Sequence, residues 1–258
     1  MNKIIIEDEK IIKSDIEYQF NEKKSLFEIS ELVLNIKSDE NLLLDISNKE
    51  ESKLVIVFNV LDNINFNLVI ITKGNKSKIQ YKYNLGKKAS CNIEKLNMVN
   101  SIREMIIASL EIDSTFNYIF KSIATNKENY DYMIYHNGIN SNSNIINNII
   151  NELGSVYIQI SSFIPKNITG CSANQFNRII NNTDNSCEIR PNLYIDCDDV
   201  EANHSALIDK FNYNELFYMY LKGIDNKNAF KLLTKGFLLS KITNKEIIDL
   251  INKRYGGE

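Results

Sequence analysis

The sequence predicts a mainly β protein whose last part is helical. From the start to about residue 203 the apolar runs are short and often alternate with polar residues, which is typical of strands. After Phe211 the apolar residues recur at helical spacing instead. Glycine and proline are scarce, so Asn-rich stretches such as "NNTDN" and "NSNSN" are expected to supply turns. We therefore predict a β body over residues 1–211 and a helical segment over 212–258.

Alternation identifies several strands in the β body. "SKIQYKY" (77–83) and "SVYIQIS" (155–161) each place apolar residues on one face, as does "YDYMIYH" (130–136), which ends before the Asn-Gly turn candidate of the chain. Two segments, 97–110 and 143–154, fit a helix as well as a strand. A solenoid and a sandwich both remain open on this pattern.

Three helices are expected after Phe211, packed on the end of the β body. The predicted N-terminal caps are Asn214, Asp225 and Thr243, the last with Glu246 at capping-box spacing, and Gly223 is the predicted stop of the first helix. The predicted apolar faces are Leu216, Phe217, Tyr220 and Leu221 in the first helix, Ala229, Leu232, Leu233, Gly236 and Phe237 in the second, and Ile247, Ile248 and Ile251 in the third.

Composition excludes several classes of protein. Hydrophobic residues make up 43% and charged residues 24%, which suits a globular core, and the net charge of −3 argues against a nucleic-acid surface. No apolar run is long enough to span a membrane, and the start is not that of an export signal. The four cysteines form no C-x-x-C pair. We expect a cytoplasmic protein with free thiols.

The stretch "CDDVEANHSALIDKF" gathers ligand-type residues. His204 is a candidate iron or zinc ligand, because a neutral imidazole binds either metal; a packed interface residue is the alternative. Asp198 and Asp199 are read as the end of a strand, with Asp199 on the face of Cys197 and a solvated strand end as the alternative. Cys197 is read as a small buried residue or, less favoured, a ligand.

Two other residues have simpler interpretations. Cys171 lies in the polar loop "ITGCSANQ" and is predicted to be the most exposed thiol. His136 precedes the Asn-Gly turn and is read as a turn residue.

The segment "RPNLYIDCDDVEANHSALIDKFNYNELFYMYLKGIDNKNAFKLLTKGFL" (190–238) resembles the C-terminal region of the SufB/SufD family, scaffold proteins of Suf iron–sulfur cluster assembly. The shared features are an acidic-acidic-Val step, a His, "LFY", a basic-Gly-Ile step and a helix that ends in Gly-Phe. They correspond to Asp198 to Val200, His204, Leu216 to Tyr218, Lys222 to Ile224, and Ala229 to Phe237.

The resemblance implies a right-handed parallel β-helix with a C-terminal helical segment. It implies a scaffold without enzymatic activity of its own, in complex with a SufC-like ABC ATPase that docks on the helical segment. A SufB-type chain or a second copy would be the dimer partner. His204, Asp199 and Cys197 are then candidate ligands of a transient iron–sulfur cluster, and a bound flavin stays an open question. Candidate ATPase contacts are Asn214, Glu215, Lys222 and Lys227.

Two departures point to a SufD-like member. SufB-type chains carry a cluster-assembly cysteine where this chain has Phe176, and a Glu directly after the His where this chain has Ser205. The strand-like start also predicts no leading helical domain, which leaves room for a short stand-alone relative.

Two other classes of protein are alternatives to the scaffold prediction. One is a β-helix polysaccharide lyase with Asp198, Asp199 and Glu201 as calcium ligands. The other is a purely structural β-solenoid.

Overall fold

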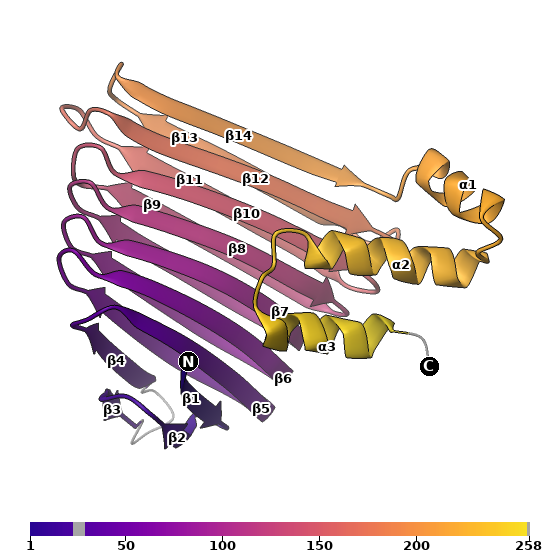
Figure 1. Ribbon diagram of the computed structural model, residues 1–258, viewed down its shortest axis with the longest axis horizontal. Coiled ribbons are helices and arrows are strands. Elements are labelled where there is room, and N and C mark those ends of the chain that lie inside the picture. Colours follow the sequence, from indigo (N-terminus) through magenta and orange to yellow (C-terminus); the bar gives the residue numbers. More distant parts are fainter. Residues whose placement is uncertain (23–28, 257–258) are drawn as a thin grey trace.

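A computed structural model describes residues 1–22 and 29–256, which form a parallel β-solenoid followed by helices (Figure 1). The strands are β1 (Asn2–Glu7), β2 (Lys10–Ser14), β3 (Gln19–Asn21), β4 (Ser30–Ile36), β5 (Glu40–Val60), β6 (Asn65–Leu85), β7 (Ser90–Leu110), β8 (Thr115–Ala124), β9 (Lys127–His136), β10 (Asn142–Asn151), β11 (Ser155–Ile164), β12 (Cys171–Asn181), β13 (Cys187–Ile195) and β14 (Val200–Asp209). The helices are α1 (Tyr213–Leu221), α2 (Asn226–Leu239) and α3 (Lys245–Tyr255).

The solenoid has two walls. The helix-side wall runs β2-β1-β5-β6-β7-β8-β10-β12-β14, and the opposite wall runs β3-β4-β5-β6-β7-β9-β11-β13. The long strands β5, β6 and β7 bend at a corner and belong to both walls. Pairing between turns is parallel; β2 and β3 pair antiparallel with β1 and β4 at the first turn. The predicted parallel β-helix is thus confirmed.

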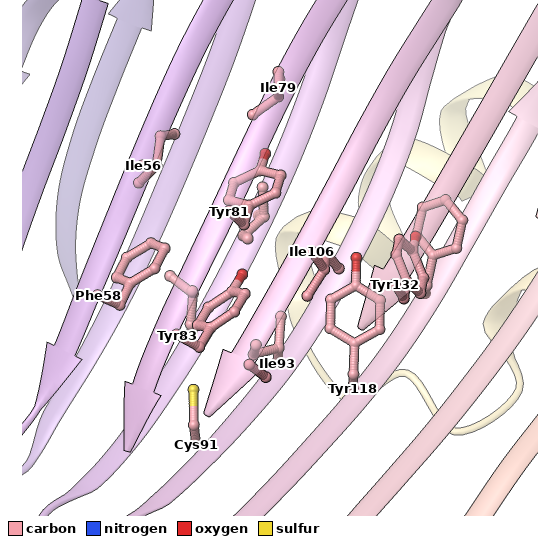
Figure 2. Close-up of a cluster of buried hydrophobic side chains, with 14 of the residues drawn as sticks. Ile56, Phe58, Ile79, Tyr81, Tyr83, Cys91, Ile93, Ile106, Tyr118 and Tyr132 are labelled. Atoms are coloured by element: carbon pink, nitrogen blue, oxygen red, sulfur yellow. The ribbon is translucent and has the colours of Figure 1, made fainter. Parts of the chain in front are cut away.

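The core lies between the two walls and is rich in aromatic rings. Phe58 stacks on Tyr83 with ring centroids 5.1 Å apart, and Tyr118 meets Tyr132 edge to face at 5.6 Å. Figure 2 shows these side chains together in the cluster of buried residues. Alternate residues of each strand enter this core, because side chains of a strand alternate between its two faces.

Both ambiguous segments are strands. Residues 97–110 fall in β7 and 143–154 fall mostly in β10. Their apolar spacing fits a helix by itself, but each strand pairs in register on both sides with other turns. Tertiary pairing therefore decides what periodicity left open.

One corner of the solenoid depends on Gly74 and Asn48. Gly74 has φ +121°, and a Cβ placed on it would overlap both the backbone and the side chain of Asn48. The Asn48 amide is buried and donates to Ser52 Oγ, Ser77 Oγ and the Lys76 carbonyl at 2.7–2.8 Å. The bend thus requires glycine at position 74, beside an Asn48 amide that is held by these hydrogen bonds.

Asparagine has two roles here. Asn63, Asn140 and Asn167 take positive φ in turns, as predicted. A second set was not foreseen: outward-facing asparagines stack in register along the helix-side wall, and several of their amides are bonded to the next turn at 2.8–3.0 Å. This ladder consists of Asn41, Asn67, Asn92, Asn117, Asn144, Asn174 and Asn203.

The expectation that the helices pack on the end of the β body is wrong. α2 and α3 lie against the outer surface of the helix-side wall (Figure 1), where Leu238, Ile247 and Ile251 join a second apolar core. Glu94 of β7 accepts hydrogen bonds from the backbone N–H groups of Thr243 and Asn244 at 2.9–3.1 Å. The helices therefore cover a side of the solenoid and leave its last turn uncovered.

Two predicted helix caps were displaced by one or two residues. Asn212, not Asn214, caps α1 and forms a capping box with Glu215. Asn244, not Thr243, caps α3, because the Thr243 hydroxyl binds Glu94 instead. The cap at Asp225 is confirmed.

The predicted apolar faces are partly wrong. α1 has no buried residue at all, although Phe217, Tyr220 and Leu221 were expected to pack. In α2 the buried residues are Ala229, Thr234 and Leu238, whereas Leu232 and Gly236 are exposed and line a groove beside the wall. Phe230, Leu233 and Phe237 are partly buried against the same core, so α2 packs on the wall through large as well as small side chains.

Candidate interface and ligand residues at the open end

The last turn of the solenoid, formed by β13 and β14, has no further strand paired to it in the described chain; we call it the open end. Most side chains of β14 are exposed, whereas alternate side chains of the neighbouring strand β12 are buried. The unpaired edge offers backbone N–H and C=O groups to another strand. Such an edge is a surface on which a second β-structure can add.

His204 faces into the solenoid at the open end. It pairs in register with Gln175 of β12, which is fully buried, so both side chains stand on the inward face. Ala202, two residues earlier, packs with Cys171 and Ala173 in a small apolar cluster. The imidazole itself is exposed, because β14 has no strand above it.

The acidic turn differs from its prediction. Asp198 and Asp199 lie in the bend between β13 and β14 and not on a strand. Cys197 lies in the same connection and is only half-buried, so it is not a core residue. In the described part of the chain, no three His, Cys, Asp or Glu side chains come together as a metal site. The structure therefore does not gather His204, Asp199 and Cys197 into one ligand set.

The prediction for Cys171 is wrong. Its side chain is 2% exposed, and the thiol lies 3.4 Å from Ser141 Oγ. The residue begins β12 and faces inward, so the polar loop ahead of it gave a misleading signal. Cys91 is also buried, and burial raises the pKa of its thiol. Cys187 is half-buried, and its pKa is raised mainly by burial.

His136 is more than a turn residue. It ends β9 fully buried, with Nδ1 2.8 Å from Ser141 Oγ and Nε2 3.0 Å from Ser143 Oγ. Burial lowers the pKa of its imidazole to about 4. Since both ring nitrogens are engaged, this histidine is a structural residue, and the Asn-Gly step after it forms a corner between the two walls.

The two departures from the SufB-type pattern are neighbours. Phe176 pairs in register with Ser205 on the outer face of the helix-side wall. Phe176 lines an apolar groove of about 760 Å³ between that wall, α1 and α2, together with Leu207 of β14. At these two positions the chain has a phenyl ring and a hydroxyl in place of the thiol and the carboxylate of the SufB-type pattern.

α1 has no buried residue, although Leu216 packs against the second apolar core. It contacts α2, and Figure 1 shows it beyond the last strands, next to β14. Asn214, Glu215, Lys222 and Lys227, the predicted partner residues, are all exposed. Glu215 also accepts a hydrogen bond from the Asn212 backbone, so one of the four has a local structural role. The largest exposed side chains of α1 are Tyr213, Phe217, Tyr218, Tyr220 and Leu221.

Sequence reasoning missed a polar cluster in the core. Lys95 and Glu104 form an ion pair with both side chains fully buried, and Tyr118 and Tyr132 each donate to Glu104 at 3.3 Å. Nearby, Glu128 accepts from Ser122 and Tyr130 at 2.9 Å, and burial raises its pKa to about 8. The indication of this cluster in the sequence is weak: charged residues occupy positions at which strand alternation predicts an inward side chain.

These features define a class of protein: a β-solenoid whose flank is covered by helices and whose last turn is exposed. Among the described helices, none is long and apolar enough to cross a membrane. The family model for the SufBD core domain of SUF system FeS cluster assembly matches residues 21–237. The chain therefore belongs to the SufBD family, which that model describes as part of SUF system FeS cluster assembly.

A curated relative gives a more local match. The chain is 39% identical over 72 residues to "Protein ABCI7, chloroplastic" from Arabidopsis thaliana. That match covers 27% of this chain and 15% of the relative's length. It supports the same family, while most of the relative lies outside the match.

Proposed function

We propose that this chain is a SufD-like scaffold that works in complex with a SufC-like ABC ATPase and has no catalytic activity of its own. The observation that carries the proposal is α1, a capped helix with no buried residue. A helix of nine residues is too short to be stable on its side-chain propensities alone. Its exposed aromatic face suits a partner that completes its packing.

The docking surface would consist of α1 and the outer side of α2. Tyr213, Phe217 and Tyr218 supply its aromatic part. Lys222 lies over the Tyr218 ring at 5.6 Å and, with Lys227, adds positive charge at the rim. Rim charges act mainly on association and are screened by salt.

We assign the open end to pairing with a second β-solenoid, either another copy or a SufB-type chain. The edge of β14 supplies backbone groups, and the adjacent groove supplies apolar surface from Phe176 and Leu207. The cytoplasm is the proposed location, because a reducing compartment keeps the free cysteines as thiols.

The iron–sulfur cluster is treated as cargo. His204 is the proposed contributor from this chain, since its imidazole faces the open end. Cys197 and Asp199 lie in the adjacent connection and would reach the cargo only with ligands from the second subunit. The lyase alternative loses support, because the described residues hold no cluster of three acidic ligands.

The docking test uses the co-expressed ATPase and matched variants. Phe217→Ser with Tyr218→Ser should weaken ATPase binding at least tenfold, since both side chains are exposed and their loss leaves the solenoid core intact. Leu153→Ser, which removes an exposed apolar side chain at a corner between β10 and β11, is the control. Equal binding by the double variant and the control would contradict the assignment.

Charge reversal at two lysines gives an independent test of the docking surface. Lys222→Glu with Lys227→Glu should reduce binding, and the reduction should shrink at high salt. Lys10→Glu with Lys87→Glu makes the same charge change on exposed residues of the β body and is the control.

Anaerobic reconstitution of the full complex with wild type or His204→Ala tests the cargo role. Equal retention of iron and sulfide by both would remove His204 as a ligand.

A further inference from the structure

Inward side chains stacked in register from turn to turn form a column that ends at His204, and its last two side chains are polar. From β5 onward the column consists of Leu42, Leu68, Ile93, Tyr118, Ile145, Gln175 and His204. The first five belong to the main hydrophobic core. An amide therefore stands, fully buried, at a position that packing alone would give to a hydrocarbon side chain.

The Gln175 amide is only half satisfied. Its Nε2 donates to Ser162 Oγ at 2.9 Å and to the Asn192 carbonyl at 3.2 Å. A carbonyl can only accept, so the Asn192 contact fixes which end of the amide is the NH2 group. The opposite atom, Oε1, is buried without a hydrogen-bond partner among the described residues. Buried carbonyl oxygens normally have a donor, so this one calls for an explanation.

His204 is a candidate donor for this oxygen. It occupies the next position of the same column, and neighbouring strands lie about 4.8 Å apart. Its side chain is exposed, so the ring can rotate toward the amide without displacing packed atoms.

We propose that Gln175 is a positioning residue whose Oε1 accepts a hydrogen bond from a ring N–H of His204. The bond holds the imidazole in one tautomer and presents its other nitrogen, with a free lone pair, at the open end. Covering the open end with a second subunit removes water and strengthens the bond. The inference rests on the proposed role of His204 in handling the cluster.

The test reads the tautomer directly. The chain has two histidines, so long-range ¹⁵N NMR of the ring nitrogens, at a pH where both imidazoles are neutral, gives two resolvable spin systems. His136, with Ser141 and Ser143 on its two nitrogens, is an internal reference. We expect His204 to be held in one tautomer in the wild type and to show a mixture in Gln175→Met. Gln80→Met, at a half-buried outward position of β6, should leave the tautomer unchanged.

Two results would overturn the inference: a tautomer mixture in the wild type, or equal populations in the wild type and Gln175→Met. The wild-type spectrum decides even where the buried variant folds poorly. A restrained tautomer together with equal iron and sulfide retention by His204→Ala would keep the hydrogen bond and remove the proposed function. A tautomer mixture in the wild type, together with loss of iron and sulfide in His204→Ala, would remove the hydrogen bond and keep the proposed function.

Discussion

Lys95 and Glu104 form an ion pair inside the solenoid, and neither side chain reaches solvent. The pair joins the two walls, because Lys95 precedes and Glu104 follows the bend in β7. Burial lowers the pKa of Lys95, while the adjacent Glu104 carboxylate opposes that shift. Removing one partner leaves a buried charge without a counter-ion, which costs far more than the intact pair contributes.

Lys95→Met should therefore destabilise the protein by about 3–5 kcal/mol. The double variant Lys95→Met with Glu104→Leu should lose much less than the sum of the single losses, because no charge is left unpaired. Denaturant unfolding of the four proteins in this cycle measures the coupling. Lys78→Met, which breaks an exposed pair with Glu51 at 3.0 Å, should cost less than about 1 kcal/mol. A similar loss in both single Lys variants would contradict the prediction.

Glu128 gives a pH dependence of stability with a definite sign. Its pKa is raised from an ordinary value of 4.5 to about 8, so between these values the folded chain keeps a proton that the unfolded chain has lost. The free energy of unfolding therefore falls as the pH rises through this window. Glu128→Gln cannot ionise, so it removes that fall. Its free energy of unfolding relative to that of the wild type should therefore increase by roughly 2–4 kcal/mol as the pH rises from 4.5 to 8.

Thermal and denaturant unfolding across that range measure the difference. Glu51→Gln is the control: hydrogen bonds from Lys78 and Lys76 lower the Glu51 pKa, so both states are ionised above pH 5. Its difference from wild type should stay constant from pH 5 to 8. A constant difference for Glu128→Gln as well would contradict the prediction.

Gly74→Ala should be among the most damaging small substitutions in the chain. The new methyl group meets Asn48 backbone atoms at a positive φ, so we expect a loss of about 2–4 kcal/mol. Gly236→Ala is the matched control, because a Cβ there meets nothing within 4 Å inside a helix. That change should stabilise the protein by up to about 1 kcal/mol. Melting temperatures of the two variants should move in opposite directions.

Glu94→Ala should loosen α3 without unfolding the solenoid. The carboxylate receives hydrogen bonds from Thr243 and Asn244 at the start of the helix, where negative charge is also favoured. Hydrogen exchange over residues 240–255 should become at least tenfold faster, while β7 stays protected. Glu94→Gln keeps the acceptor geometry without the charge and should lie in between. Unchanged exchange in both variants would show that apolar packing alone holds the helix.

Some of the fold followed from local pattern. Ile79, Tyr81 and Tyr83 were placed on one inward face by alternation, and all three are buried. The change to helical spacing after Phe211 and the cap at Asp225 were also correct. These features depend on residues a few positions apart, so they can be read from the chain.

The errors arose where distant contacts compete with local signals. Thr243 had capping-box spacing, but its hydroxyl binds Glu94, 149 residues away. Cys171 followed a polar loop, yet its strand turns it inward. The exposed aromatic residues of α1 looked like a core stripe, because apolar spacing alone does not tell which side chains the fold buries.

The sequence by itself determined where the β-rich part of the chain gives way to helices and which family the chain resembles. Only the tertiary structure decided which side chains share a column, such as Gln175 beneath His204. Stacked residues are 25 positions apart at Asn67 and Asn92 but 30 apart at Asn147 and Asn177. The turns differ in length, so no fixed period predicts the neighbours; backbone pairing between turns sets them.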